Sequence, residues 1–317
     1  SQNAFNLLYK GVDVYRSTGY YQNFSDAHNL MSYRHTRAHN SLLVNGIGQP
    51  YSTEGYGSVM RAMGGQHISY CLGDASHAYR SISNDPMWVG YFKQAGIEQT
   101  PENGFGATPL TKYRRHVLML HPHTVIVYDE LEASEAVRWE WLLHSPTEFK
   151  IDAVKKTLST DNKTKGWVAV TQLFGGHVFT LSQTDRFVVP PAITGAEYPN
   201  QWHLTARVDG CSATRFLAII QVGDEAVSII NRDGDTFNVG DWTIKAVLDA
   251  SKAPELTVSH RTEQAVFSYG TDNPALNGNF YSRQYTGSSL LYDEIDGAYQ
   301  VVEMTDRSPI STRVVNQ

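Results

Sequence analysis

The chain has 317 residues, with 26 Lys and Arg against 32 Asp and Glu, so its formal net charge is −6 at neutral pH. Because a nucleic-acid partner needs a basic face for its phosphates, this balance argues against nucleic acid, although a few local arginines still suffice for an acidic ligand. No apolar run of about eighteen residues is present, which argues against a transmembrane helix. Two cysteines, Cys71 and Cys211, are too few for a disulfide framework.

Short apolar and β-branched segments, bounded by Gly, Asn, Asp or Pro, recur along the whole chain and predict strands. In chain order we expect them at residues 5–10, 12–16, 41–44, 58–63, 66–72, 112–120, 124–128, 137–143, 148–151, 167–173, 177–181, 202–208, 214–222, 226–230, 242–248, 265–269, 289–292 and 299–304. Residues 129–135 are expected to form an acidic turn. Residues 81–111 and 186–201, rich in Gly and Pro, are expected to form long loops, and no helix of three turns is expected.

Many short strands joined by turns predict an all-β fold. We expect a large antiparallel β-sandwich (a super-sandwich) over residues 1–235 and a smaller C-terminal β-sheet region over residues 236–317. The boundary is placed near residues 231–241, where the expected strands become shorter.

The segment from Gly19 to Pro50 concentrates groups that can carry protons, bind metal or hold an anion. Three of the twelve histidines lie within twelve residues there, together with tyrosines, arginines and an aspartate: His28, His35, His39, Tyr20, Tyr21, Tyr33, Arg34, Arg37, Asp26 and Asn40. The segment then enters an apolar strand at 41–44. A polar loop delivered by a strand is a common way to mount a site on a β scaffold.

The residue types leave several alternatives open. His28, His35 and His39 with Asp26 could hold zinc, or His39 could simply hydrogen-bond the backbone at a strand entrance. Two arginines, Arg34 and Arg37, could hold a carboxylate or sulfate, or could pair with local carboxylates. The neighbouring Tyr20 and Tyr21 could stack on a sugar ring or plug the end of the sandwich.

Other groups give weaker signals. His121 and His123 flank a proline in a turn and could chelate a metal, and the acidic residues Asp129, Glu130 and Glu132 could bind calcium or be solvated. Cys71 lies near His67 and His77, which would suit a Cys–His hydrolase. No GxSxG nucleophile motif and no glycine-rich phosphate loop is present.

Three blocks of sequence resemble the β-rich C-terminal part of heparinase II/III-type polysaccharide lyases, including the exolytic alginate lyase branch. They read SQNAFNLLYKGVDVYRSTGYY, TRAHNSLLVNGIGQP and YRRHVLMLHPHTVIVYDELEASEAVRWEWLLHS, and the pattern AHN-x-x-x-V-x-G-x-G-Q is the most specific. The resemblance implies an (α/α) toroid before this β part and β-elimination at a uronate. In that reaction a base removes the C5 proton, an acid protonates the oxygen leaving C4, and a neighbouring group neutralises the carboxylate.

The resemblance places the catalytic Tyr and an Asn or His on the toroid, and another His in an HxH segment that would precede Ser1. No catalytic residue is therefore assigned here, the chain alone is expected to be inactive, and its start suggests that upstream sequence has been removed. We expect substrate contacts from five residues, with His28 facing the cleft: Tyr20, Tyr21, His28, Arg34 and Arg37. Some family members hold a structural zinc, for which His39 matches one ligand, whereas Arg16 or Ser17 stands where an Asp is needed.

The full-length protein is thus expected to be a periplasmic or secreted lyase of an acidic polysaccharide such as alginate or a glycosaminoglycan. An alternative is a non-catalytic β-sandwich that binds carbohydrate or braces a partner domain. A third hypothesis is a metal hydrolase built on the three histidines of the segment 19–50. An upstream helical region ending in HxH would favour the lyase, whereas tight zinc in the purified chain would favour the hydrolase.

Overall fold

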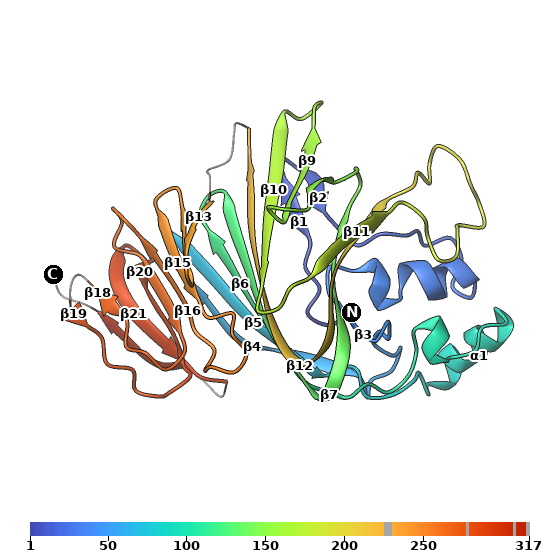
Figure 1. Cartoon of the computed structure of the whole chain (residues 1–317), viewed down its shortest axis with the longest axis horizontal. Helices are drawn as coiled ribbons and strands as arrows, with labels where there is room; N and C mark the ends of the chain where they lie inside the picture. The colour runs from blue at the N-terminus through green and yellow to red at the C-terminus, as the bar shows by residue number, and fades with distance from the viewer. Residues whose placement is uncertain (225–229, 277–278, 307–308, 315–317) are drawn as a thin grey trace.

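The computed structural model describes residues 1–224, 230–276, 279–306 and 309–314. Two large antiparallel sheets pack against each other, and short helices gather at one end of the first sheet (Figure 1). The predicted all-β fold with a large antiparallel sandwich is confirmed.

The first sheet has ten strands: β3 (Leu42–Val44), β4 (Tyr56–Gly64), β5 (Ile68–His77), β6 (Leu110–Leu120), β7 (Thr124–Ser145), β8 (Lys150–Asp152), β9 (Thr157–Asn162), β10 (Trp167–Gly175), β11 (Thr180–Thr184) and β12 (Trp202–Gly223). Their order is β4–β5–β6–β7–β12–β10–β9–β8, with β3 paired to β7 and β11 paired to β12. A small hairpin of β1 (Leu7–Tyr9) and β2 (Val12–Tyr15) precedes this sheet in the chain.

The second sheet has eight strands: β13 (Ile230–Asp233), β14 (Thr236–Val239), β15 (Trp242–Ala246), β16 (Leu256–His260), β17 (Val266–Tyr269), β20 (Ser289–Ile295), β21 (Ala298–Met304) and β22 (Pro309–Val314). Neighbours in this list are neighbours in the sheet. Between β17 and β20 the chain forms a minor hairpin of β18 (Ala275–Leu276) and β19 (Asn279–Phe280).

The first sheet is buried on both faces, and the alternation of side chains along β12 shows how. Phe216, Ala218 and Ile220 belong to one core, which also contains Trp139 and Trp141 of β7. The intervening residues Leu217 and Ile219 face the second sheet, where they share a core with apolar residues of β14 to β17 and β20. Successive side chains in a strand point to opposite faces, so a single strand serves both cores.

The expected acidic turn at residues 129–135 is wrong, because these residues lie inside the 22-residue strand β7. The Asp129 carboxylate accepts hydrogen bonds from Nε and Nη2 of Arg115 on β6, both at 2.8 Å. Glu130 Oε1 lies 2.9 Å from Nε2 of His116, which is also on β6. Arg115 and Lys112, whose Nζ lies 2.9 Å from Oε2 of Glu130, neutralise these carboxylates, so the charges do not force the chain into solvent. Asp129 and Glu130 are therefore engaged within the sheet.

Residues 202–208 and 214–222, expected as two strands, are likewise one strand, β12. Register shifts between Val208 and Ala213 mark bulges there, and Gly210 adopts a φ of +72°. A bulge interrupts the alternation of apolar residues without ending the strand, which explains the error.

The expected loop 81–111 contains a helix, α1 (Pro86–Gln94), and a 3-10 turn, η3 (Pro101–Asn103). Asp85 caps α1 by accepting a hydrogen bond from the Met87 amide at 2.9 Å, and Pro86 opens the first turn. Nine residues make less than three turns. Two further short helices, η1 (Asn29–Tyr33) and η2 (Thr36–Ala38), lie within the segment 19–50. No helix in the described part of the chain is long and apolar enough to cross a membrane.

Candidate functional site

The segment of residues 19–50, called the focal segment below, is fastened to the loop of residues 186–201, called the second loop. The Gln22 side chain pairs with the backbone of Ile193: its Nε2 donates to the carbonyl oxygen at 2.8 Å, and its Oε1 accepts from the amide at 3.1 Å. The Gly19 amide donates to Oε1 of Gln201 at 2.7 Å. In Figure 1 the second loop, in yellow, lies beside the helices at this end of the molecule. The focal segment and the second loop are thus joined by hydrogen bonds.

His28 lies between these two loops and is 1% exposed. Its Nε2 accepts a hydrogen bond from the Tyr20 amide at 3.0 Å, and its Nδ1 lies 2.6 Å from the carbonyl oxygen of Val189. Burial lowers the pKa of His28. The Tyr20 ring stacks on His28, and its hydroxyl donates to the carbonyl oxygen of Pro199. Both residues were predicted to contact substrate, and in this structure their polar atoms hold the loops together. Their contact with substrate stays a prediction.

His35 is fully buried and ties η2 to the loop after α1. Its Nε2 lies 2.9 Å from the carbonyl oxygen of Gly104, and its Nδ1 accepts from Nε of Arg37 at 3.0 Å. Burial lowers the pKa of His35 well below its ordinary value, so the ring is neutral at physiological pH. Arg37 also donates through Nη2 to the carbonyl oxygen of Asn103 at 2.6 Å. Part of the Arg37 guanidinium is therefore engaged within the protein.

His39, the predicted zinc ligand, uses both ring nitrogens within the protein. Its Nδ1 lies 2.7 Å from Oγ of Ser17, and its Nε2 lies 3.3 Å from the carbonyl oxygen of Arg34. Burial lowers its pKa to about 4. The position expected for an Asp ligand holds Arg16 or Ser17, and the described residues contain no cluster of three His, Cys, Asp or Glu with metal-site geometry. As the described residues stand, His39 has no free ring nitrogen for zinc, and zinc binding stays a prediction.

Arg34 lies in an aromatic cage that only the structure reveals. Its guanidinium carbon lies 4.7 Å from the centre of the Phe24 ring, 5.1 Å from that of Trp88 on α1, and 6.0 Å from that of Tyr21. The Nε atom is buried and has no hydrogen-bond partner within the described chain. Tyr21 is 52% exposed, so the cage opens to solvent. We call these four residues the Arg34 cage.

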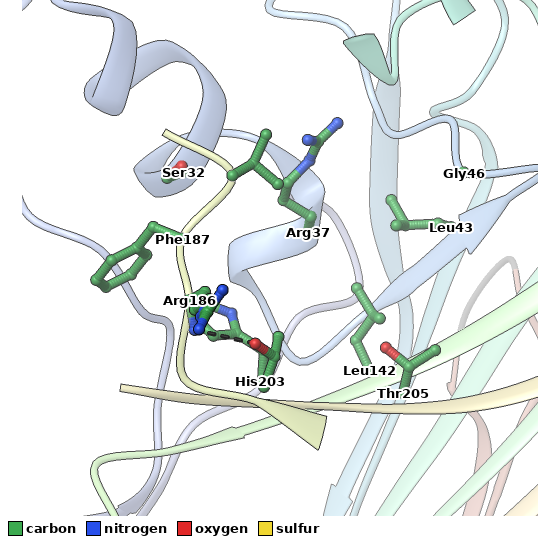
Figure 2. A pocket seen from close by; sticks show the side chains of 11 residues that line it. Ser32, Arg37, Leu43, Gly46, Leu142, Arg186, Phe187, His203 and Thr205 are labelled. Atoms are coloured by element: carbon green, nitrogen blue, oxygen red, sulfur yellow. Dashed lines mark hydrogen bonds between the residues drawn. The ribbon is translucent and has the colours of Figure 1, made fainter. Parts of the chain in front are cut away.

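A pocket of about 300 Å³ lies beside the focal segment. Leu43 of β3, Leu142 of β7 and Phe187 of the second loop line it, with the two leucines on the side opposite the second loop (Figure 2). His203 of β12 also lines it, with a buried Nε2 atom that has no partner among the described residues. Figure 2 shows the Arg37 side chain at the pocket with its guanidinium directed away from His203.

Burial lowers the pKa of His203 to about 4, so this imidazole is neutral at physiological pH and is a weak base. The pocket therefore suits binding better than proton abstraction. Arg186 of the second loop also lines the pocket and adds a positive charge at its exposed side.

The structure also adds site residues that the sequence did not single out, namely Trp88, Arg186, Phe187 and His203. The signal for Trp88 was the Asp85-Pro86 pair, which marks the start of the helix that carries it. No local pattern marks His203, because β3 and β7 bring the focal segment to β12 only in the folded sheet.

The weaker candidates from the sequence, His121, His123 and Cys71, contact other parts of the fold. His121 Nε2 lies 2.9 Å from Oγ of Ser69, and the His123 ring lies against Tyr9. Cys71 is a free thiol, as is Cys211, and burial raises the pKa of the Cys71 thiol. A nucleophilic cysteine needs a lowered pKa, so this surrounding does not favour a Cys–His hydrolase.

The sequence matches the family described as heparinase II/III-like, C-terminal, over residues 1–207. Among solved structures, the chain is similar to the heparinase III BT4657 gene product, with 14% identity and a TM-score of 0.54, covering 84% of this chain and 36% of that one. It is also similar to the heparan sulfate lyase HepC from Pedobacter heparinus, with 12% identity and a TM-score of 0.53, covering 89% and 37%. No curated protein matches the sequence.

At these identities the structural likeness concerns the fold alone. The chain spans little more than a third of the length of those two chains.

Proposed function

Because the chain belongs to the heparinase II/III-like C-terminal family, we propose that it is the β-sheet part of a lyase that cleaves a uronate-containing acidic polysaccharide by β-elimination. The observation that carries the proposal is the family match over residues 1–207, which includes the focal segment, α1 and the second loop. The predicted membership of this family is confirmed. The activity and the substrate belong to the proposal.

Elimination needs a base at C5, an acid at the C4 oxygen and positive charge at the carboxylate. The histidines of the focal segment offer no free base, since both ring nitrogens of each lie within hydrogen-bonding distance of protein groups. Nε2 of His203 has no partner among the residues that the structure describes, but the pKa of about 4 makes this imidazole a poor base at neutral pH. The proton transfers would therefore come from outside the described residues.

We place these transfers on a preceding (α/α) toroid domain. The heparinase structures are nearly three times as long as the part that this chain covers, which leaves room for such a domain. In this arrangement the present chain forms one wall of the substrate cleft and is inactive, or nearly so, on its own. A polysaccharide substrate lies outside the cytoplasm, so a periplasmic or secreted enzyme is part of the proposal.

Two of the predicted substrate contacts in that wall are the best placed to meet a ligand. Tyr21 is exposed, and Arg34 has a nitrogen without a partner among the described residues. Arg37 would neutralise a carboxylate through the part of its guanidinium that Asn103 and His35 do not hold. Tyr20 and His28 would act by fixing the second loop beside the cleft.

The test compares the protein encoded by the complete gene with the present chain. Each is incubated with alginate, heparan sulfate and chondroitin sulfate, and the absorbance of the C4–C5 double bond is followed. We expect the complete protein to form unsaturated product on at least one of these glycans and the present chain to form little or none. If the complete protein forms none on any of them, the lyase proposal is wrong and the non-catalytic binding module replaces it.

A further inference from the structure

We propose that the Arg34 cage is a binding subsite for a negatively charged sugar residue. It is distinct from the pocket of Figure 2, because none of its four residues lines that pocket. The choice of a sugar as ligand rests on the proposed function. The choice of an anion rests on the geometry of the cage itself.

The Arg34 guanidinium lacks a partner within the described residues. Within the described chain no carboxylate pairs with this guanidinium, whereas Arg61, Arg114 and Arg115 each pair with an aspartate. Nε of Arg34 is buried without an acceptor. An arginine in a partly buried site that lacks an acceptor is costly, so a ligand that offers acceptors to the terminal nitrogens of this guanidinium would be favoured. A carboxylate or a sulfate ester presents two oxygens that match the guanidinium fork.

The aromatic rings of the cage also hold the guanidinium in place. Phe24 stacks on Trp88 with ring centres 5.5 Å apart, and Tyr21 meets Phe24 edge-on at 5.8 Å. A cation that lies over such rings is attracted by their π faces. Because these rings restrict the arginine before any ligand arrives, less side-chain entropy is lost on binding.

The cage also presents exposed aromatic surface beside the charge. Tyr21 is half exposed, and Trp88 and Phe24 are partly exposed. An exposed aromatic face next to a cation suits the apolar face of a sugar ring that carries an acidic group at its edge. A protein with a net charge of −6 attracts such a ligand only through local positive charge, and Arg34 supplies it here.

The cage is rigid because two well-packed segments build it. Three of its residues belong to the focal segment, and Trp88 comes from α1. That helix is anchored by Phe92, which is 3% exposed and stacks on Tyr51 with ring centres 5.6 Å apart. The Tyr51 hydroxyl in turn donates to the carbonyl oxygen of Leu30 in η1 at 2.5 Å.

The test measures binding of oligosaccharides to the present chain by calorimetry, with the change in tryptophan fluorescence as a second signal. Alginate oligosaccharides carry carboxylates, dextran sulfate carries sulfate esters, heparan sulfate carries both, and cello-oligosaccharides carry neither. We expect the acidic glycans to bind, the neutral one to bind at least about tenfold more weakly, and the affinity to fall with salt. The carboxylate and sulfate arms identify which group the cage prefers.

Three variants assign the binding to the cage. Arg34→Gln removes the charge and should weaken acidic glycans about tenfold or more, and Arg34→Lys should fall between it and the parent, because an ammonium keeps the charge without the fork. Tyr21→Ala removes an exposed wall with little risk to folding and should also weaken binding. The matched control is Arg232→Gln, which should leave binding unchanged, because Arg232, on β13 of the second sheet, lies over Phe174 and Phe237, outside the cage.

The subsite is wrong if Arg34→Gln and Tyr21→Ala bind acidic glycans as tightly as the parent, or if the parent binds none of them. Melting curves show whether each variant is folded. If Arg34→Gln is not folded, the binding measured with Tyr21→Ala decides whether the subsite exists. The lyase assay is independent of this result. A complete protein without lyase activity, whose acidic-glycan binding still depends on Arg34, would refute the proposed function and leave the subsite standing.

Discussion

At the scale of single residues, His28, His35 and His39 join separate segments at the site end through their ring nitrogens. In His28, His35, His39 and His203, burial lowers the pKa, so these rings are neutral at physiological pH. A neutral imidazole has one donor and one acceptor nitrogen, which lets it join two backbone segments. The composition of the focal segment predicted a chemical role for these rings. Their partners lie as far away in sequence as Gly104 and Val189, so the sequence alone did not reveal the structural role.

The same lowered pKa values predict that acid destabilises the protein. The pKa of His203 is about 4 in the folded chain and 6.5 as its ordinary value. Between these values the unfolded chain binds more protons, so the free energy of unfolding falls as pH drops from 6.5 to about 4 and this contribution levels off below. The full contribution of His203 is about 3 kcal/mol.

Urea unfolding of the parent and of His203→Gln between pH 7 and pH 4 measures this effect. We expect the parent to lose more stability than the variant over that window. Equal losses in the two proteins would contradict a buried neutral His203.

A second residue-scale prediction concerns Arg115, which is 2% exposed. It pairs with Asp129 and also donates through Nη1 to the carbonyl oxygens of Asn3 and Asn40, both at 2.7 Å. Arg115→Met leaves the Asp129 carboxylate buried without its cation, which should cost about 3–5 kcal/mol of unfolding free energy.

The matched control for Arg115→Met is Arg207→Met. Arg207 also pairs with an aspartate, Asp209, but on the surface, where such a pair contributes at most about 1 kcal/mol. Chemical denaturation of both variants gives the comparison. Equal losses would contradict the structural role assigned to the buried pair.

At the scale of elements, the sequence predicted strand positions well and strand ends less well. The periodicity located β6, the two apolar ends of β7 and both halves of β12. It failed at residues 129–135, because the partners of Asp129 and Glu130 lie on β6 and turn a polar stretch into the middle of a strand. At the site, the focal segment was found from its composition, whereas the cage and the pocket also need α1, β12 and the second loop, which long-range packing brings there.

An element-scale prediction concerns the tight join between η2 and the turn after η3. Gly104 has a φ of +88°, and a Cβ atom there would lie 2.2 Å from Nη2 of Arg37 and 2.7 Å from Nε2 of His35. Gly104→Ala should therefore cost the strain of a left-handed residue, about 1 kcal/mol, and about 1–3 kcal/mol more for the clash.

Gly96→Ala is the control for Gly104→Ala. Gly96 also has a positive φ, +67°, but a Cβ atom there meets nothing within 4 Å. Thermal unfolding of the two variants isolates the clash. If Gly104→Ala is no less stable than Gly96→Ala, the close packing of Arg37 and His35 on this turn is wrong.

At the scale of the whole molecule, the two sheets share a core. Leu217 and Ile219 of the first sheet and Phe267 and Leu291 of the second belong to one buried cluster. We expect the sheets to unfold together in one calorimetric transition, because the unfolding of either sheet would expose the part of this cluster that lies on the other sheet. Phe267→Ala, which should cost about 3–5 kcal/mol, should lower that single transition as a whole. Two separate transitions, with only one lowered by the substitution, would contradict a shared core.

If this chain is the β-sheet wall of a uronate lyase, as we propose, the products that the complete protein forms reveal it. Elimination leaves a C4–C5 double bond, so each product pair contains one molecule of water less than the pair that hydrolysis forms. We expect mass spectrometry of a digested acidic polysaccharide to show these unsaturated ends. Products that have all gained water, or an intact polysaccharide, would contradict the claim.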